Sequence, residues 1–197
     1  MQELEKIHNW AVAADETGQC ATAFECFHRV IAIEPTNDKA YYRAAKNLLQ
    51  IGRISAAAHY LMQINRHAVP KPWLIDIAFG ELYLAQFKLA EAEKHFRSAW
   101  DIGKVSSVPA VFLADYLIKL ERFNEASSVL LESLLTAQDE LDEVYFNLAI
   151  IRRAESNYPA ARDFLLKAIE IDPDYQDAAR VLSDVNLCMD TMRLIDA

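Results

Sequence analysis

The sequence predicts an all-α chain built from five repeated pairs of antiparallel helices. Four columns of residues recur along the chain at steps of 34, 35, 34 and 35 residues. Members of these columns have helical spacing, because Ala161, Leu165 and Ala168 lie four and three residues apart and therefore share one face. Only four glycines and six prolines occur in 197 residues, which argues against a turn-rich all-β protein.

The repeated columns combine small and large residues. A small residue falls partway along the first helix of each pair and another early in the second helix. The columns are Ala11, Ala45, Gly80, Ala114 and Ala149; Ala23, Ala57, Ala92, Ala126 and Ala161; Phe27, Leu61, Phe96, Leu130 and Leu165; and Val30, Ile64, Ala99, Ser133 and Ala168. Small residues allow two helix axes to approach to about 8–10 Å. The sequence therefore predicts helical hairpins that must stack to bury their apolar faces.

Turn residues give the expected boundaries of the helices. Gly18 and Gly52 mark turns inside pairs, while Pro35, Pro70 and Pro173 end repeats. We expect helix pairs at 4–17 with 20–33, 38–50 with 54–67, 72–86 with 88–102, 108–120 with 122–136, and 141–155 with 158–171. One more helix is expected at about 174–193.

This division predicts one array of five repeats in residues 1–175. The repeats span about 4–37, 38–71, 72–106, 107–140 and 141–175, and residues 176–197 form a C-terminal capping or linking helix. Two positions depart from the pattern, since Asp76 replaces a large apolar residue and Arg152 an aromatic one. We expect both positions to pack less tightly or to be partly exposed.

The last repeat resembles the tetratricopeptide repeat, whose pattern is W-x2-L-G-x2-Y, then A-x3-F, then P, with a period of 34 residues. The matching residues here are Tyr145-x2-Leu148-Ala149, Ala161-x3-Leu165 and Pro173. The resemblance covers roughly residues 4–175. It implies a right-handed α-solenoid superhelix of about eleven helices, whose first helices line a concave groove that holds a peptide or a helix.

The composition and the motifs exclude several function classes. A formal net charge of −9 disfavours nucleic acid or an acidic membrane surface as the main partner. No apolar run approaches the roughly 18 residues of a membrane span, and neither a phosphate-binding loop nor a nucleophile elbow is present. The histidines lack metal-ligand spacing. We therefore predict no catalytic residue, metal or cofactor.

The setting expected for this chain is reducing and cytoplasmic. Its three cysteines form neither a CxxC pair nor an even disulfide set, and the charged N-terminus carries no secretory signal.

Surface recognition is the function that these exclusions leave. Residues of the first helices that are not used for packing inside a pair form an apolar stripe flanked by charges. The predicted groove consists of Tyr42, Lys46, Leu74, Ile77, Glu81, Leu84, Val111, Asp115, Ile118, Phe146, Ile150 and Arg153. It predicts a scaffold or adaptor that binds a protein or peptide ligand. The alternative for the same stripe is ordinary core, or a surface covered by a terminal helix.

Three further expectations concern the partner and the wider protein. Members of the family that bind chaperones share a clamp of basic residues that holds a C-terminal carboxylate. Arg43 alone does not form such a clamp, so binding of a chaperone tail is disfavoured. The chain could instead be the N-terminal, substrate-positioning region of a larger transferase, such as a sulfotransferase or glycosyltransferase. The apolar tail after Val181 favours this reading and also a homodimer through the C-terminal helix.

Overall fold

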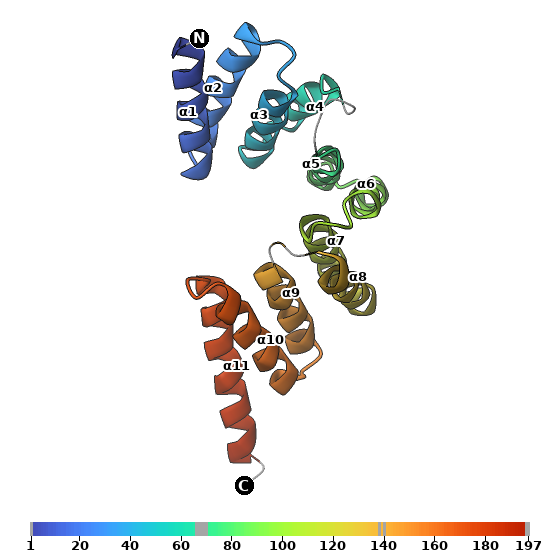
Figure 1. Cartoon of the computed structure of the whole chain (residues 1–197). Coiled ribbons are helices and arrows are strands. Elements are labelled where there is room, and N and C mark those ends of the chain that lie inside the picture. Colours follow the sequence, from blue (N-terminus) through green and yellow to red (C-terminus); the bar gives the residue numbers. More distant parts are fainter. Residues whose placement is uncertain (1, 66–70, 138, 140, 196–197) are drawn as a thin grey trace. The chain divides into compact units, whose positions relative to one another are not determined.

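The structure is a computed structural model that describes residues 2–65, 71–137, 139 and 141–195. Within these ranges the chain forms eleven α-helices and no β-strand, as the sequence predicts (Figure 1). The chain divides into two compact units, Met1–Ile102 and Gly103–Ala197. The predicted grouping of the helices into five repeats is a separate question and stays a prediction.

Each unit is a series of helices joined by short connections. Unit 1 contains α1 (Gln2–Glu16), α2 (Cys20–Ile33), α3 (Asp38–Gln50), α4 (Ile54–Met62), α5 (Trp73–Ala85) and α6 (Leu89–Ile102). Unit 2 contains α7 (Val108–Lys119), α8 (Phe123–Thr136), α9 (Leu141–Ala154), α10 (Tyr158–Ile171) and α11 (Gln176–Ile195). Most boundaries lie within two residues of those expected from the sequence.

The end of α4 is the exception, because the sequence predicts that this helix continues to residue 67. The helix ends at Met62, where the N–H of Gln63 bonds a carbonyl only three residues back and tightens the last turn. The N–H of Asn65 then donates to the carboxylate of Asp38 at 2.9 Å instead of continuing the helix. Residues 66–70, which include Pro70, lie outside the described residues.

The repeated columns form the core of each helix pair. All twenty of their members are buried. The approach is tightest at Gly80 of α5, where a Cβ atom would lie only 2.6 Å from the ring of Phe96 on α6. The small and large residues therefore have the roles that the sequence predicts for them.

Second helices lie between the first helices of consecutive pairs. In unit 1, α2 packs against both α1 and α3. One buried cluster there joins Ala11 of α1, Phe27 and Val30 of α2, and Ala44 of α3. In unit 2, α10 packs against both α9 and α11. Each helix pair thus completes the core of its neighbour within the unit.

Asp76 does not follow the expectation of loose packing, because its side chain is almost fully buried. Its Oδ1 atom lies 3.0 Å from Nδ1 of His95 on α6. The imidazole ring of His95 stacks against Phe79 and Tyr83, with 5.3 Å between ring centroids in each case. Burial of a carboxylate costs free energy unless the group is hydrogen-bonded, and His95 on the next helix supplies the polar partner. Arg152, in contrast, is partly exposed as predicted.

The turns inside all five pairs share one backbone conformation. In the α5–α6 turn, the N–H of Phe87 bonds the carbonyl of Leu84, and the N–H of Lys88 bonds that of Tyr83, both at 2.9 Å. This pair of bonds is the Schellman motif, which requires a residue with positive φ. In these five turns the residues with positive φ are Gly18, Gly52, Phe87, Glu121 and Ser156, with φ between 58° and 75°. Only the two glycines could be predicted from the sequence.

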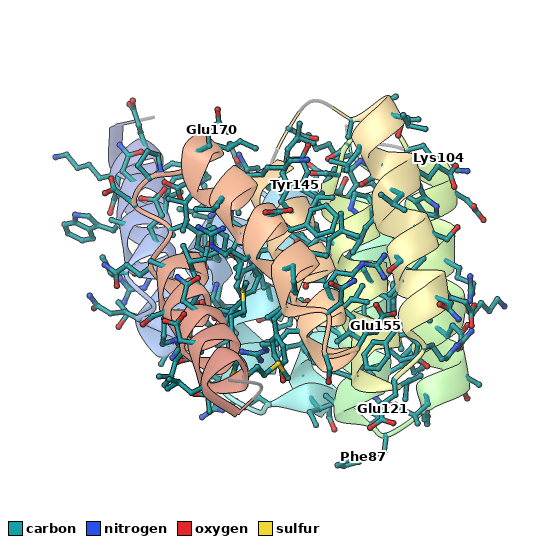
Figure 2. The ribbon with its side chains drawn as sticks, turned by 90° about the horizontal axis from the view of Figure 1, so that it is seen from below. Phe87, Lys104, Glu121, Tyr145, Glu155 and Glu170 are labelled. Carbon is teal, nitrogen blue, oxygen red and sulfur yellow. The ribbon has the colours of Figure 1, made fainter. Side chains whose placement is uncertain are left out.

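Replacing Phe87 with glycine is expected to stabilise the chain. An L residue in this conformation costs about 1–2 kcal/mol, and the greater unfolded-state entropy of glycine offsets part of the gain, which leaves about 0.5–1 kcal/mol. The Phe87 side chain is 89% exposed and points away from the ribbon, so its removal loses little packing (Figure 2). Urea unfolding of F87G measures the gain. F87A is the matched control, and the explanation is wrong if F87G is no more stable than F87A.

Hydrogen bonds also connect residues that lie about one repeat apart in the sequence. In unit 2, the carboxylate of Asp139, which precedes α9, accepts hydrogen bonds from Ser106 Oγ at 2.7 Å and from the N–H of Ser107 at 2.8 Å. The hydroxyl of Ser107 donates to the backbone carbonyl of Asp139. Because Ser107 immediately precedes α7 and is fully buried, these bonds tie the start of one helix pair to the start of the next.

Candidate protein-interaction faces

The twelve predicted groove residues divide equally between the two units. Unit 1 carries Tyr42, Lys46, Leu74, Ile77, Glu81 and Leu84, and unit 2 carries Val111, Asp115, Ile118, Phe146, Ile150 and Arg153. Every one of them lies on a first helix, α3 or α5 in unit 1 and α7 or α9 in unit 2. Eleven of the twelve are partly exposed.

Ile77 is the exception, because its side chain is only 1% exposed. The helix α5 is apolar around most of its circumference, and four consecutive residues, 75 to 78, are all buried. A helix that is apolar all round is normally buried, so the apolar stripe alone could not separate surface from core here. Ile77 is a core residue and not part of an open surface.

A polar network joins α1 and α3 on the first-helix face of unit 1. The guanidinium of Arg43 pairs with the carboxylate of Asp15. Nδ2 of Asn47 donates to Oδ1 of Asp15 at 2.7 Å and to the carbonyl of Arg43 at 2.9 Å. Oδ1 of Asn47 is buried and accepts no hydrogen bond from the described residues. Arg43 is therefore engaged inside the protein.

Sequence reasoning missed Asp15 and Asn47 as members of this network. A signal was nevertheless present, because the positions one repeat step after Asn47 hold Leu82, Tyr116 and Ile151. An amide in a column of large, buried side chains needs hydrogen-bond partners. A search of neighbouring helices for those partners would have found Asp15.

Tyr42 lies beside this network and within the electrostatic influence of α5. Burial raises the pKa of Tyr42 to about 12, and the carboxylate of Glu81 adds to this effect. The phenol therefore remains neutral at physiological pH, as a polar group on a partly apolar face. Lys46, one turn further along α3, forms no ion pair with the described residues.

On α7, a lysine neighbour partly neutralises the one negative charge among the predicted groove residues of that helix. Asp115 pairs with Lys119 at 2.6 Å, one turn later on the same helix. Since both side chains are half exposed, water screens the pair and it contributes little to stability. Val111 and Ile118, one turn away on either side of Asp115, remain partly exposed as apolar contacts.

The segment that leads into the terminal helix covers part of the predicted face of unit 2. Phe146 and Ile150 pack against the buried cluster to which α11 contributes Val181 and Val185. The ring of Phe146 lies 5.1 Å from that of Tyr175, which precedes α11. Phe146 is therefore partly covered by the segment before α11, while Arg153 remains partly exposed and without an ion pair among the described residues.

Tyr175 holds the connection to α11 in place. Its hydroxyl donates to a carboxylate oxygen of Glu143 at 2.8 Å. Burial raises the pKa of Tyr175 well above its usual range, and the hydrogen bond to Glu143 acts in the same direction. The protonated phenol is therefore the form that keeps this contact.

The described residues provide neither a metal cluster nor a membrane anchor. Within them, no group of three or more histidine, cysteine, aspartate or glutamate side chains is placed to hold an ion. Among the helices that the structure describes, none is both long and apolar enough to cross a bilayer.

Comparison with known proteins identifies the fold. The family model for the tetratricopeptide repeat matches residues 142–175, and comparison with curated proteins gives no match. A thermophilic tetratricopeptide repeat protein of Thermus thermophilus superposes with a TM-score of 0.79 at 17% identity, covering 93% of this chain and 99% of its own.

Two other similar structures are of proteins with peptide-binding sites. YrrB, described as having an unusual peptide-binding site, gives a TM-score of 0.56 at 15% identity and 89% coverage of both chains. The first repeat domain of Spaghetti, bound to the HSP90 peptide SRMEEVD, gives 0.53 at 19% identity, covering 59% of this chain and 92% of its own. This chain therefore shares the fold of tetratricopeptide repeat proteins, and its residues 142–175 match that repeat in sequence as well.

Proposed function

We propose that this chain is a non-catalytic protein-interaction scaffold that binds a peptide or a helix on its first-helix faces. The observation that carries the proposal is the combination of partly exposed apolar side chains with cations that lack an ion pair among the described residues. Leu84 and Val111 supply apolar surface, and Lys46 and Arg153 supply the cations. Such mixed surfaces are typical of sites that recognise protein segments.

The proposed ligand follows from the chemistry of each face. Apolar side chains of the ligand, at helical or extended spacing, would contact Tyr42 and Leu84 in unit 1. A carboxylate of the ligand would pair with Lys46. A clamp for a C-terminal carboxylate is not favoured, because Arg43 already pairs with Asp15. The peptide-binding site of YrrB supports the proposal through similarity of fold.

Charged substitutions on the first-helix faces test the proposal. L84D and V111D each place a carboxylate in the proposed contact surface, and both positions are partly exposed, so the fold should persist. The wild-type chain captures partners from a lysate, and the affinity of each purified partner for the variants is then measured by calorimetry. We expect the Kd to rise by about tenfold or more, since a buried, unpaired charge is costly.

The control for this experiment is L135D on the second helix α8, where the native side chain is 87% exposed. Circular dichroism verifies that all three variants are folded. If L84D and V111D bind every captured partner with wild-type affinity, the first-helix faces are not the binding site.

A further inference from the structure

The first helix pair of unit 1 exposes a face that later pairs bury. Trp10 of α1 is 68% exposed, which is unusual for so large an apolar side chain. The residues at the same repeat position are Ala44, Phe79, Leu113 and Leu148, of which three are fully buried and Phe79 partly. Ala13, which is exposed, corresponds to Asn47, Leu82, Tyr116 and Ile151, all of them buried.

The packing inside unit 1 shows what normally covers such a face. Ala44 of α3 lies in one buried cluster with Ala23, Phe27 and Val30 of α2. The covering element is thus an amphipathic helix with a small residue, a large one four positions later and an apolar one three further on. No helix among the described residues of unit 1 covers α1 at Trp10 in this way.

The exposed face is hollowed and carries no charge at its centre. A shallow depression of about 350 Å³ is lined by Trp10, Ala13, Ala14, Thr17, Gln19, Thr22 and Cys26. Lys6 and Arg29, each about one helical turn from a lining residue, are exposed and form no ion pair with the described residues. We call this region, from Lys6 to Arg29 around Trp10, the head surface.

The C-terminal helix of unit 2 carries an exposed stripe with the matching chemistry. On α11, Leu187 is 68% exposed, and Cys188, Met192 and Leu194 are also exposed. Cys188 and Met192 are four residues apart, a small and a large residue spaced like Ala23 and Phe27. Asp184 is exposed one turn before Leu187. We call these five residues of α11 the tail surface.

We propose that the tail surface of one copy of this chain docks on the head surface of a second copy. The apolar stripe of α11 fills the depression beside Trp10, in the place that α2 takes beside Ala44 of α3. The carboxylate of Asp184 then meets the cations at the edge of the head surface. Because the two surfaces differ, the contact is heterologous and leaves one head and one tail open for further copies.

Sedimentation at increasing protein concentration tests this proposal on the full chain. The wild-type mass is expected to rise beyond that of a dimer. W10D and L187D should each weaken association by about tenfold or more, because each places a carboxylate in the apolar contact. The matched controls are M62D and L135D, whose native side chains are 71% and 87% exposed outside both surfaces. These controls should associate like the wild type.

Mixing the two variants separates this interface from a symmetric one. W10D keeps an intact tail, and L187D keeps an intact head. An equimolar mixture should therefore form a dimer that grows no further, while each variant alone associates at least about tenfold more weakly than the mixture. The proposal is overturned if the wild type remains a monomer up to about 1 mM, near the weak end of specific binding. It is also overturned if the wild type stops at a dimer, or if mixing restores no association. Circular dichroism establishes that both variants are folded.

Discussion

Replacing Phe27 with alanine is expected to lower the free energy of unfolding by about 3–5 kcal/mol, the usual cost of removing a buried phenylalanine ring. The Phe27 side chain is fully buried in the cluster that joins α1, α2 and α3. The ring of His8 lies in a T-shaped arrangement with that of Phe27, 6.3 Å between centroids, and the guanidinium of Arg43 lies 6.0 Å from the ring centre. Three helices therefore lose contacts when the ring is removed.

Urea unfolding of F27A, followed by circular dichroism, measures this loss. F87A is the matched control, because it makes the same chemical change at a side chain that is 89% exposed. We expect F87A to change stability by no more than about 0.5 kcal/mol, as is usual for surface substitutions. A loss below about 1 kcal/mol for F27A would contradict the role of the repeated large residue as core.

Substituting Asp139 with alanine is expected to cost about 1–3 kcal/mol, the usual penalty for leaving buried donors without an acceptor. The carboxylate accepts from the hydroxyl of Ser106 and from the backbone N–H of Ser107. Both donors belong to buried residues at the start of α7, so water cannot easily replace the lost acceptor. The start of this helix pair should loosen first.

Hydrogen exchange provides the local readout for this variant. The amide of Ser107 should lose protection in D139A more strongly than amides in the middle of α7. D101A removes an exposed carboxylate from α6 and serves as the control, with stability close to wild type. Unchanged protection of Ser107 in D139A would show that the tie does not hold the start of α7.

The core was predictable because close helix crossings require small residues, which therefore recur at regular intervals in the sequence. Positions such as Ala23, Phe27 and Gly80 occupy fixed columns, and each is buried where the columns place it. The turns were less predictable, since Phe87 and Ser156 adopt a conformation for which glycine is the usual signal. At these positions the stacking of the two helices determines the turn, and the residue accommodates the strain.

The surface could not be separated from the core by pattern alone. Ile77 and Leu84 belong to the same apolar stripe of α5, yet only Leu84 is partly exposed. Asp76 has a polar side chain and is nevertheless buried, because its partner His95 stands on another helix. Contacts of Phe146 with the segment before α11 depend on where the terminal helix turns back. Each case depends on distances between helices, which a single sequence does not record.

The packing of helices only with near neighbours has a consequence for how each unit folds. Within a unit, the principal contacts join helices that are consecutive or separated by a single helix, such as α3 with α5 and α7 with α9. Contacts therefore form between segments about one repeat apart, and only short loops must close before they do. The entropy lost in closing such loops is small, and chains with this low contact order fold quickly. A helix pair can begin to form beside its neighbour before distant parts of the chain have been ordered.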